Sequence, residues 1–216
     1  QLIDQNTLNG DQFSKILEVI TYMYLQHEEL EVDIIKTLEI IENKIYNRFL
    51  KKLIDEGYVE KIKFGYYQWQ DERAFSEATV IARLFPDAVI CMESALQYYG
   101  YTDRTPSAWC LAVDKHSTKS RFNIDYPSVK PHYIPEEQMI LGVEMVNIED
   151  TKLKIFNRER VICDCLRQEN KMDVEVFNKA IQAYIKDPKK NVPRLMEYAK
   201  ILRPENKVRK MIGVWL

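Results

Sequence analysis

The strongest constraint on the fold comes from residues 43–57, where a helical pattern ends at a glycine and leads directly into strand-like sequence. At about 100° per residue, one side of this helix is apolar and must pack on other elements; it carries Ile45, Tyr46, Phe49, Leu50 and Leu53. The opposite side spans an arc of about 100° and is polar, with Lys44, Asn47, Arg48, Lys51 and Asp55. Gly57 suits a helix C-terminal cap.

Two strand-like runs follow this helix, over residues 58–63 and 66–69, and Phe64-Gly65 between them predicts a tight hairpin turn. Upstream, apolar residues at helical spacing predict a helix over 11–26 and a shorter one over about 30–38. Three helices followed by a hairpin make a winged helix-turn-helix, which we expect over residues 1–70. In this fold the third helix enters the major groove of DNA and the hairpin contacts the backbone or the minor groove.

The polar side of the third helix and the hairpin are therefore the predicted DNA contacts. These candidate residues are Lys44, Asn47, Arg48, Lys51, Lys61 and Lys63. The alternative is a protein-interaction module of the same shape. Residues 1–42 favour that alternative, because they hold nine acidic side chains against two lysines.

Residues 71–216 are expected to form one α+β domain that ends in a helical segment. Strands are predicted over 88–92, 108–113 and 129–134, the last as an edge strand, and a hairpin over 143–148 and 153–156. Helices are predicted over 76–84, 93–99, 158–168, 174–186, 192–202 and 205–215. Because most strands precede most helices, the order favours α+β over a doubly wound sheet.

The net charge of −2 conceals a basic C-terminal third, where residues 151–216 carry sixteen basic and eight acidic side chains. The basic residues form three clusters: Lys152, Lys154, Arg158 and Arg160; Lys186, Lys189, Lys190 and Arg194; and Arg203, Lys207, Arg209 and Lys210. If the clusters share a face, they offer a surface for DNA, RNA or a nucleotide. The alternative is three separately solvated helix ends.

Catalytic and metal-binding patterns are weak in this sequence. His27, His116 and His132 have no partner at i+3 or i+4, so each is expected to be a surface or hydrogen-bonded histidine. The pair Cys163-x-Cys165 has the wrong spacing for a redox pair or zinc knuckle, and one packed and one half-buried thiol are expected. Ser94 lacks the glycines of a nucleophile elbow and is predicted to cap a helix. We therefore expect no enzyme activity, no cofactor and no metal.

One enzymatic alternative rests on Asp87, with Asp150 and Lys152 downstream. Two carboxylates can hold Mg²⁺ and a lysine can orient a water molecule, as in metal-dependent nucleases. Local turn formation explains the same residues more simply, because Asp150 lies in the predicted hairpin turn.

Four strings give the chain a resemblance to a known family: GYVEKIKFGYYQW (57–69), ARLFPDAVICMESALQYYGYTDRTPSAWCLAV (82–113), KIFNRERVICDCLRQ (154–168) and LMEYAKILR (195–203). In this order they resemble the wing, central region, strand-to-helix passage with an Arg–Asp pair, and late helix of AbiEi-type antitoxins. The resemblance implies an antitoxin of a type IV toxin–antitoxin, or abortive infection, system. Its winged helix would bind double-stranded operator DNA and repress its own operon. Its C-terminal domain would counter a nucleotidyltransferase-type toxin. We expect no stable complex between the two proteins.

Location and membrane association are predicted from composition. Residues 1–10 are polar and lack the apolar core of a secretory signal, and no run approaches the roughly 20 apolar residues of a membrane span. The four scattered cysteines favour a reducing compartment. These features predict a cytoplasmic protein that does not contact membranes.

The alternative to the antitoxin function is a winged-helix regulator whose C-terminal domain senses a ligand or a protein.

Overall fold

The computed structural model describes residues 51, 54, 55, 57, 59–63, 66–69, 76–124 and 126–213. The chain divides into two compact units, residues 1–74 and 75–216. The predicted helices over 11–26 and 30–38 lie outside the described residues, as do Lys44, Asn47 and Arg48 among the predicted DNA contacts.

In the first unit, the described residues are the end of the helix predicted over 43–57 and the two strands of the hairpin. Lys51, Ile54 and Asp55 are helical. Gly57 has φ +78°, and its N–H donates to the carbonyl of Ile54 at 3.0 Å, which closes the helix as predicted. Strand β1 (Val59–Lys63) then pairs antiparallel with β2 (Tyr66–Trp69). The predicted hairpin is therefore confirmed, with an irregular register between Lys61 and Lys63.

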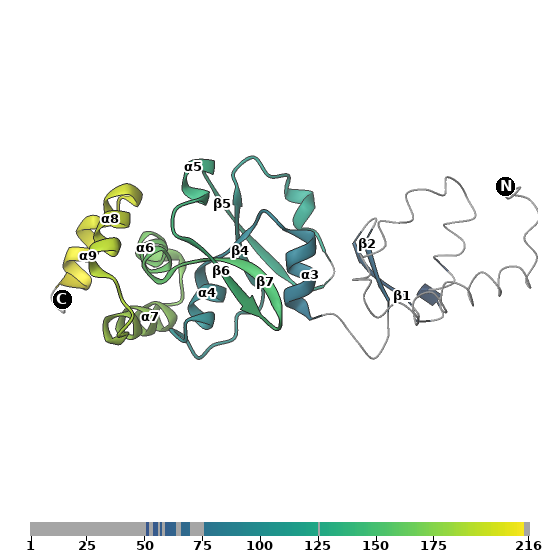
Figure 1. The fold of residues 1–216 in the computed structure, drawn as a ribbon, viewed down its shortest axis with the longest axis horizontal. Coiled ribbons are helices and arrows are strands. Elements are labelled where there is room, and N and C mark those ends of the chain that lie inside the picture. The colour runs from purple at the N-terminus through teal and green to yellow at the C-terminus, as the bar shows by residue number, and fades with distance from the viewer. Residues whose placement is uncertain are drawn as a thin grey trace, which may run out of the picture. The chain divides into compact units, whose positions relative to one another are not determined.

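The second unit is built on a five-stranded mixed sheet in the order β5-β4-β3-β7-β6 (Figure 1). Its strands are β3 (Val89–Ile90), β4 (Trp109–Asp114), β5 (Val129–Ile134), β6 (Val143–Ile148) and β7 (Thr151–Phe156). The pairs β4–β5 and β3–β7 are parallel, and β3–β4 and β6–β7 are antiparallel. The predicted edge position of β5 is confirmed, which accommodates Pro131 because one side of an edge strand needs no donors.

Helices cover this sheet and extend beyond it. They are α3 (Glu77–Leu84), α4 (Met92–Tyr98), α5 (Glu136–Met139), α6 (Arg158–Gln168), α7 (Val174–Lys186), α8 (Val192–Leu202) and α9 (Glu205–Met211), with short 3₁₀ turns η2 (Lys119–Phe122) and η3 (Glu169–Lys171). Figure 1 shows α6 between the sheet and helices α8 and α9. The second unit is thus α+β and ends in a helical segment, as predicted.

Several predicted bounds differ from the structure, among them the start of β7, which is Thr151 rather than residue 153, and two further differences are larger. The strand expected over 88–92 is only Val89–Ile90, because Met92 has φ +46° and turns the chain into α4. Cys91, between them, still donates its N–H to the carbonyl of Cys110 at 2.9 Å. The helix expected over 205–215 ends at Met211, and residues 214–216 lie outside the described part of the chain.

Helix α6 is enclosed, because it packs against α4, α7, α8 and α9. Cys163 and Cys165 are both fully buried as a result, so the expectation of one half-buried thiol is wrong. Arg160 is also 0% exposed, and it is held by Asp164 and by two backbone carbonyls. Buried charges require such partners, so Arg160 is part of the core rather than of a basic surface.

Asp187, in the loop after α7, connects three parts of the second unit. Its carboxylate accepts hydrogen bonds from the Tyr101 hydroxyl at 2.6 Å, from Arg158 Nε at 3.0 Å and from the Lys189 N–H at 2.7 Å. Burial alone would raise the pKa of Asp187, but the hydrogen bonds and the charge of Arg158 lower it below its usual value. The ionised carboxylate therefore stabilises the fold.

We expect this stabilisation to be lost in acid. A carboxyl whose pKa is lowered by folding stabilises the protein above its unfolded-state pKa of about 3.9, and the stabilisation disappears as the pH falls through the lower folded value. Asp187→Asn should cost about 1–3 kcal/mol at pH 7, with a smaller difference from wild type at pH 3. Urea unfolding between pH 7 and pH 3 measures this. An equal cost at both pH values would contradict the assignment.

Candidate functional site

The described part of the predicted DNA interface consists of Lys51, Lys61 and Lys63. Lys51 is exposed near the end of the third helix, and Lys61 is exposed on β1. Lys63 ends β1 opposite Tyr66. The irregular register between Lys61 and Lys63 has the character of a β-bulge, which redirects side chains along a strand. Both lysines thus belong to a hairpin that directly follows a helix end.

The three basic clusters of the C-terminal third differ in what their members contact. In the first, Arg160 is buried, Arg158 pairs with Asp187, and Lys154 Nζ donates to the Pro86 carbonyl at 3.0 Å. In the third, Lys207 pairs with Glu169 at 2.8 Å and Arg209 pairs with Glu205 at 2.9 Å. Much of this positive charge is therefore paired with acidic side chains or hydrogen-bonded to the backbone within the second unit.

Among the described residues, the second cluster has the fewest ion pairs of the three, since only Arg194 has one. Lys186 and Lys189 are exposed where α7 leads into α8, and Lys190 is half-buried beside them. Arg194 is exposed as well, although its guanidinium lies 3.9 Å from the carboxylate of buried Glu159. We call Lys186, Lys189 and Lys190 the α7–α8 corner. The positive charge of these lysines is therefore available to bind a polyanion.

Asp87 and Asp150, the two carboxylates of the nuclease alternative, both have structural roles: Asp87 pairs with an arginine, and Asp150 lies in a hairpin turn. Arg121 binds both carboxylate oxygens of Asp87, and this pairing lowers the pKa of Asp87. Glu149 and Asp150 form the β6–β7 turn with φ +48° and +63°, the left-handed pair of a two-residue hairpin. The lysine that reaches the Pro86–Asp87 segment is Lys154 rather than Lys152.

A pocket with a volume of about 500 Å³ opens beside α3, α4 and the start of β4. Three aromatic side chains line it, namely Tyr98, Trp109 and Tyr126, together with the carboxylate of Glu77. Trp109 Nε1 donates to one Glu77 oxygen at 2.6 Å, and the Tyr126 hydroxyl donates to the other. The volume lies in the range of small-molecule sites, and aromatic walls with one oriented charge are typical of them.

Ser94 lies on the wall of this pocket. The sequence predicts that Ser94 caps a helix, and this prediction is wrong. The N-terminal cap position belongs to Cys91, and Ser94 is inside the helix. Its hydroxyl accepts a hydrogen bond from the Cys110 N–H at 2.8 Å and faces the Ala108 carbonyl at 3.5 Å. Ser94 therefore joins α4 to β4, because a backbone donor of the strand needs this partner.

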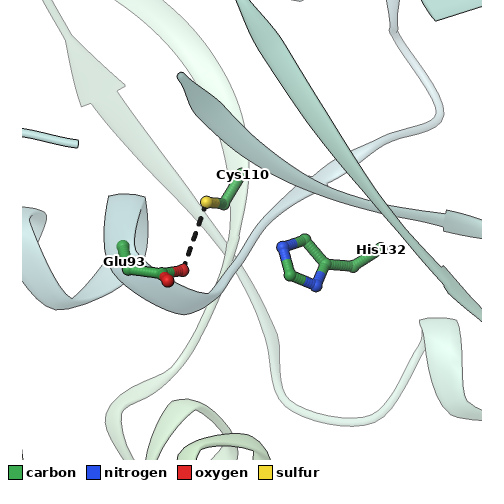
Figure 2. A group of neighbouring side chains, drawn as sticks. All are labelled: Glu93, Cys110 and His132. Carbon is green, nitrogen blue, oxygen red and sulfur yellow. Dashed lines mark hydrogen bonds between the residues drawn. The ribbon is translucent and has the colours of Figure 1, made fainter. Parts of the chain in front are cut away.

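Beside this junction, Glu93, Cys110 and His132 form a compact cluster (Figure 2). Glu93 comes from the first turn of α4, Cys110 from β4 and His132 from β5. One ligand atom from each residue lies within 4.8 Å of the other two, and the Cys110 thiol donates to Glu93 Oε2 at 3.3 Å. Figure 2 shows the imidazole directed toward the space beside the other two side chains.

The electrostatics of the cluster favour a neutral imidazole and a neutral thiol beside an ionised carboxylate. Burial lowers the pKa of His132, and the charge of Lys130 lowers it further. Burial and the Glu93 carboxylate raise the pKa of Cys110 to about 11. Burial would raise the pKa of Glu93, but a backbone hydrogen bond and Lys130, whose Nζ lies 3.6 Å away, lower it below its usual value.

His132 departs from the sequence expectation of a surface or hydrogen-bonded histidine. It is half-buried, and its buried Nε2 has no hydrogen-bond partner among the described residues. The expectation considers only neighbours at i+3 or i+4 on a helix, whereas Cys110 and His132 come together on neighbouring strands of the sheet. Parallel pairing sets Cys110 beside Lys130 and Ala112 beside His132, so Cys110 and His132 share one face.

Comparisons with known proteins returned no match, either among protein-family models or among curated protein sequences. Within the part of the chain that the structure describes, no helix has both the length and the apolar character needed to cross a membrane.

Proposed function

We propose that the chain is a cytoplasmic, DNA-binding transcriptional autorepressor and antitoxin of a type IV toxin–antitoxin system. The observation that carries the proposal is a helix that ends at Gly57 and leads into the β1–β2 hairpin, with exposed Lys51 and Lys61 on the two elements. A winged helix presents these two elements to DNA, the helix to the major groove and the hairpin to the backbone.

The order of elements in the second unit supports the antitoxin half of the proposal. The string over 82–113, which resembles the family's central region, contains β3, α4 and β4 in that order. The string over 154–168 passes from β7 into α6 and contains the Arg160–Asp164 pair, at 2.9 Å. The resemblance implies an opposing nucleotidyltransferase-type toxin.

The α7–α8 corner is the part of the second unit that we assign to neutralisation. Its lysines would engage RNA or a nucleotide that such a toxin needs, which explains neutralisation without a stable protein complex. Among the described residues its three lysines form no ion pair, whereas Arg158, Lys207 and Arg209 of the other clusters do. Lysines bind phosphate as point charges, so their effect depends on sign more than on side-chain shape.

Co-expression with a nucleotidyltransferase encoded beside this chain tests that assignment. We expect the wild-type chain to restore growth, and Lys186→Glu with Lys189→Glu to lose rescue while binding operator DNA normally. The matched control is Lys200→Glu with Lys210→Glu, two exposed lysines on α8 and α9, which should rescue fully. Rescue by both double variants would contradict the role of the corner, and no rescue by wild type would contradict the antitoxin function.

A second candidate function is favoured by the pocket at Glu77. A winged-helix regulator that senses a ligand needs an effector site, and a 500 Å³ cavity lined by three aromatic side chains fits that need. The two functions differ in their genetic neighbourhood, because only the antitoxin requires a nucleotidyltransferase-like gene beside its own. They also differ in co-expression, where a sensor gives no rescue.

A further inference from the structure

The geometry points to a divalent transition-metal site formed by Glu93, Cys110 and His132, with Zn²⁺ as the best-fitting ion. The site lies outside the predicted DNA interface and does not depend on the proposed function. It also goes against the sequence expectation of no metal, because its three donors are separated by seventeen and twenty-two residues along the chain. The protein fold, rather than a sequence motif, brings them together.

The donor set is specific in its chemistry. One thiol sulfur, one imidazole nitrogen and one carboxylate oxygen are the three ligand types that Zn²⁺ takes in proteins. Mg²⁺ and Ca²⁺ prefer sites made of oxygen alone. The sulfur and the nitrogen of this cluster therefore select for Zn²⁺, Co²⁺ and related ions over the more abundant hard cations.

The distances require only a small closure of the site. Tetrahedral zinc with bonds of about 2.0–2.3 Å places its ligand atoms roughly 3.3–3.8 Å from one another. Cys110 Sγ and Glu93 Oε2 are already 3.3 Å apart, and all three ligand atoms lie within 4.8 Å of one another. A rotamer adjustment of His132 and Glu93 closes the remaining gap, because both are side chains of intermediate burial rather than fixed core residues.

Two features indicate a ligand at this position rather than a chance contact. The Nε2 atom of His132 is buried without a hydrogen-bond partner among the described residues, which costs free energy that a metal bond would recover. The Glu93 side chain is 24% exposed, so an ion has a path from solvent. When the metal–sulfur bond forms, Cys110 releases its thiol proton to solvent, and the metal takes the place of the thiol–carboxylate hydrogen bond.

Three protein ligands leave a fourth position for water, as in open zinc sites. The ion would join α4 to both β4 and β5, next to the Ser94–Cys110 hydrogen bond that already joins α4 to β4. Binding is therefore expected to stabilise the sheet edge and the α4 wall of the pocket. Lys130, whose Nζ lies 3.6 Å from a Glu93 oxygen, opposes the ion through its positive charge.

Cobalt titration of the reduced, chelator-treated full chain tests the site. Co²⁺ reports a thiolate ligand by a near-ultraviolet charge-transfer band, and we expect one equivalent to saturate this band and one equivalent of Zn²⁺ to abolish it. Zn²⁺ should also raise the unfolding temperature, because it binds the native state, whereas Mg²⁺ should not. Cys110→Ser and His132→Gln should each remove the band, and Lys130→Gln should tighten binding about two- to fivefold.

Two controls match the site variants. Cys91→Ser changes a thiol that is 2% exposed, as Cys110 is, and His116→Gln changes an exposed histidine. Both should keep the band. Absence of the band in the wild-type chain would overturn the proposal. Persistence of the band in either Cys110→Ser or His132→Gln would also overturn it, and circular dichroism of each variant verifies that it is folded.

Discussion

Arg160→Ala is expected to lower the free energy of unfolding by about 3–5 kcal/mol, because it leaves buried groups without their charged partner. Arg160 Nε donates to Asp164 at 2.9 Å, and its Nη1 donates to the carbonyls of Gln138 and Leu141 at 2.7 and 2.9 Å. The guanidinium also lies 4.0 Å from the centre of the Phe156 ring. Removing the side chain leaves these acceptors unpaired and opens a cavity in the core.

Two further variants separate the cost of the unpaired buried charge from the cost of the lost side-chain volume. Burial raises the pKa of Asp164, while the guanidinium groups of Arg160 and Arg167 oppose that rise. Arg160→Met combined with Asp164→Leu removes both charges and keeps the volume, so it should recover the part of the lost stability that the unpaired Asp164 and the cavity cost. Arg167→Ala, at a partly exposed partner of Asp164, should cost about 1 kcal/mol or less.

Chemical denaturation followed by circular dichroism measures these three variants. An unfolding free energy of Arg160→Ala within about 1 kcal/mol of wild type, the usual range for a surface ion pair, would contradict the structural role assigned to the buried pair. A double variant no more stable than Arg160→Ala would show that the unpaired Asp164 is not the cause.

Arg48→Ala combined with Lys51→Ala is expected to weaken operator binding on the order of 10²-fold or more, at about 1–3 kcal/mol for each lost contact. The two positions are three residues apart, so the predicted helix over 43–57 would place them within about 60° of each other on its polar side. Arg48 can make a bidentate contact to guanine, and Lys51, which is exposed, can contact a base or a phosphate. The double variant should therefore also lose sequence preference.

The wing lysines provide the contrast to this result. Lys61→Ala combined with Lys63→Ala should weaken binding to all DNA sequences alike and reduce the salt dependence, because phosphate contacts carry no sequence information. Lys200→Ala, an exposed lysine of the second unit, is the matched control and should bind as wild type does. Gel shifts on the upstream DNA measure all of these. Unchanged binding by the Arg48/Lys51 variant would remove the third helix from the interface.

The helices of the second unit show how local signals can define a structure. The predicted bounds of α6, α7 and α8 agree with the structure to the residue. Each of these helices begins after a side chain that caps its N-terminus: Asn157, Asp173 and Asn191. The amphipathic periodicity then continues to the last residue of each helix, so the bounds of these helices can be predicted without knowledge of distant contacts.

The errors occur where contacts distant in sequence decide the structure. Met92 begins α4 at a positive φ, directly after Cys91, whose backbone N–H donates to the Cys110 carbonyl on the neighbouring strand, and no local pattern encodes that pairing. Ser94 looked like a helix cap, but its partner is the Cys110 N–H, sixteen residues away. The Glu93–Cys110–His132 cluster depends on the parallel pairing of β4 and β5, which residue spacing does not reveal.

Binding of the full chain to its own upstream DNA, compared with a shuffled duplex of equal length at the same salt concentration, tests the central claim most directly. Fluorescence anisotropy gives both dissociation constants. A sequence-specific repressor should bind the upstream DNA about 10³-fold more tightly or better. Equal affinity for the two duplexes, or no binding to either, would contradict the proposal that this chain represses its own operon.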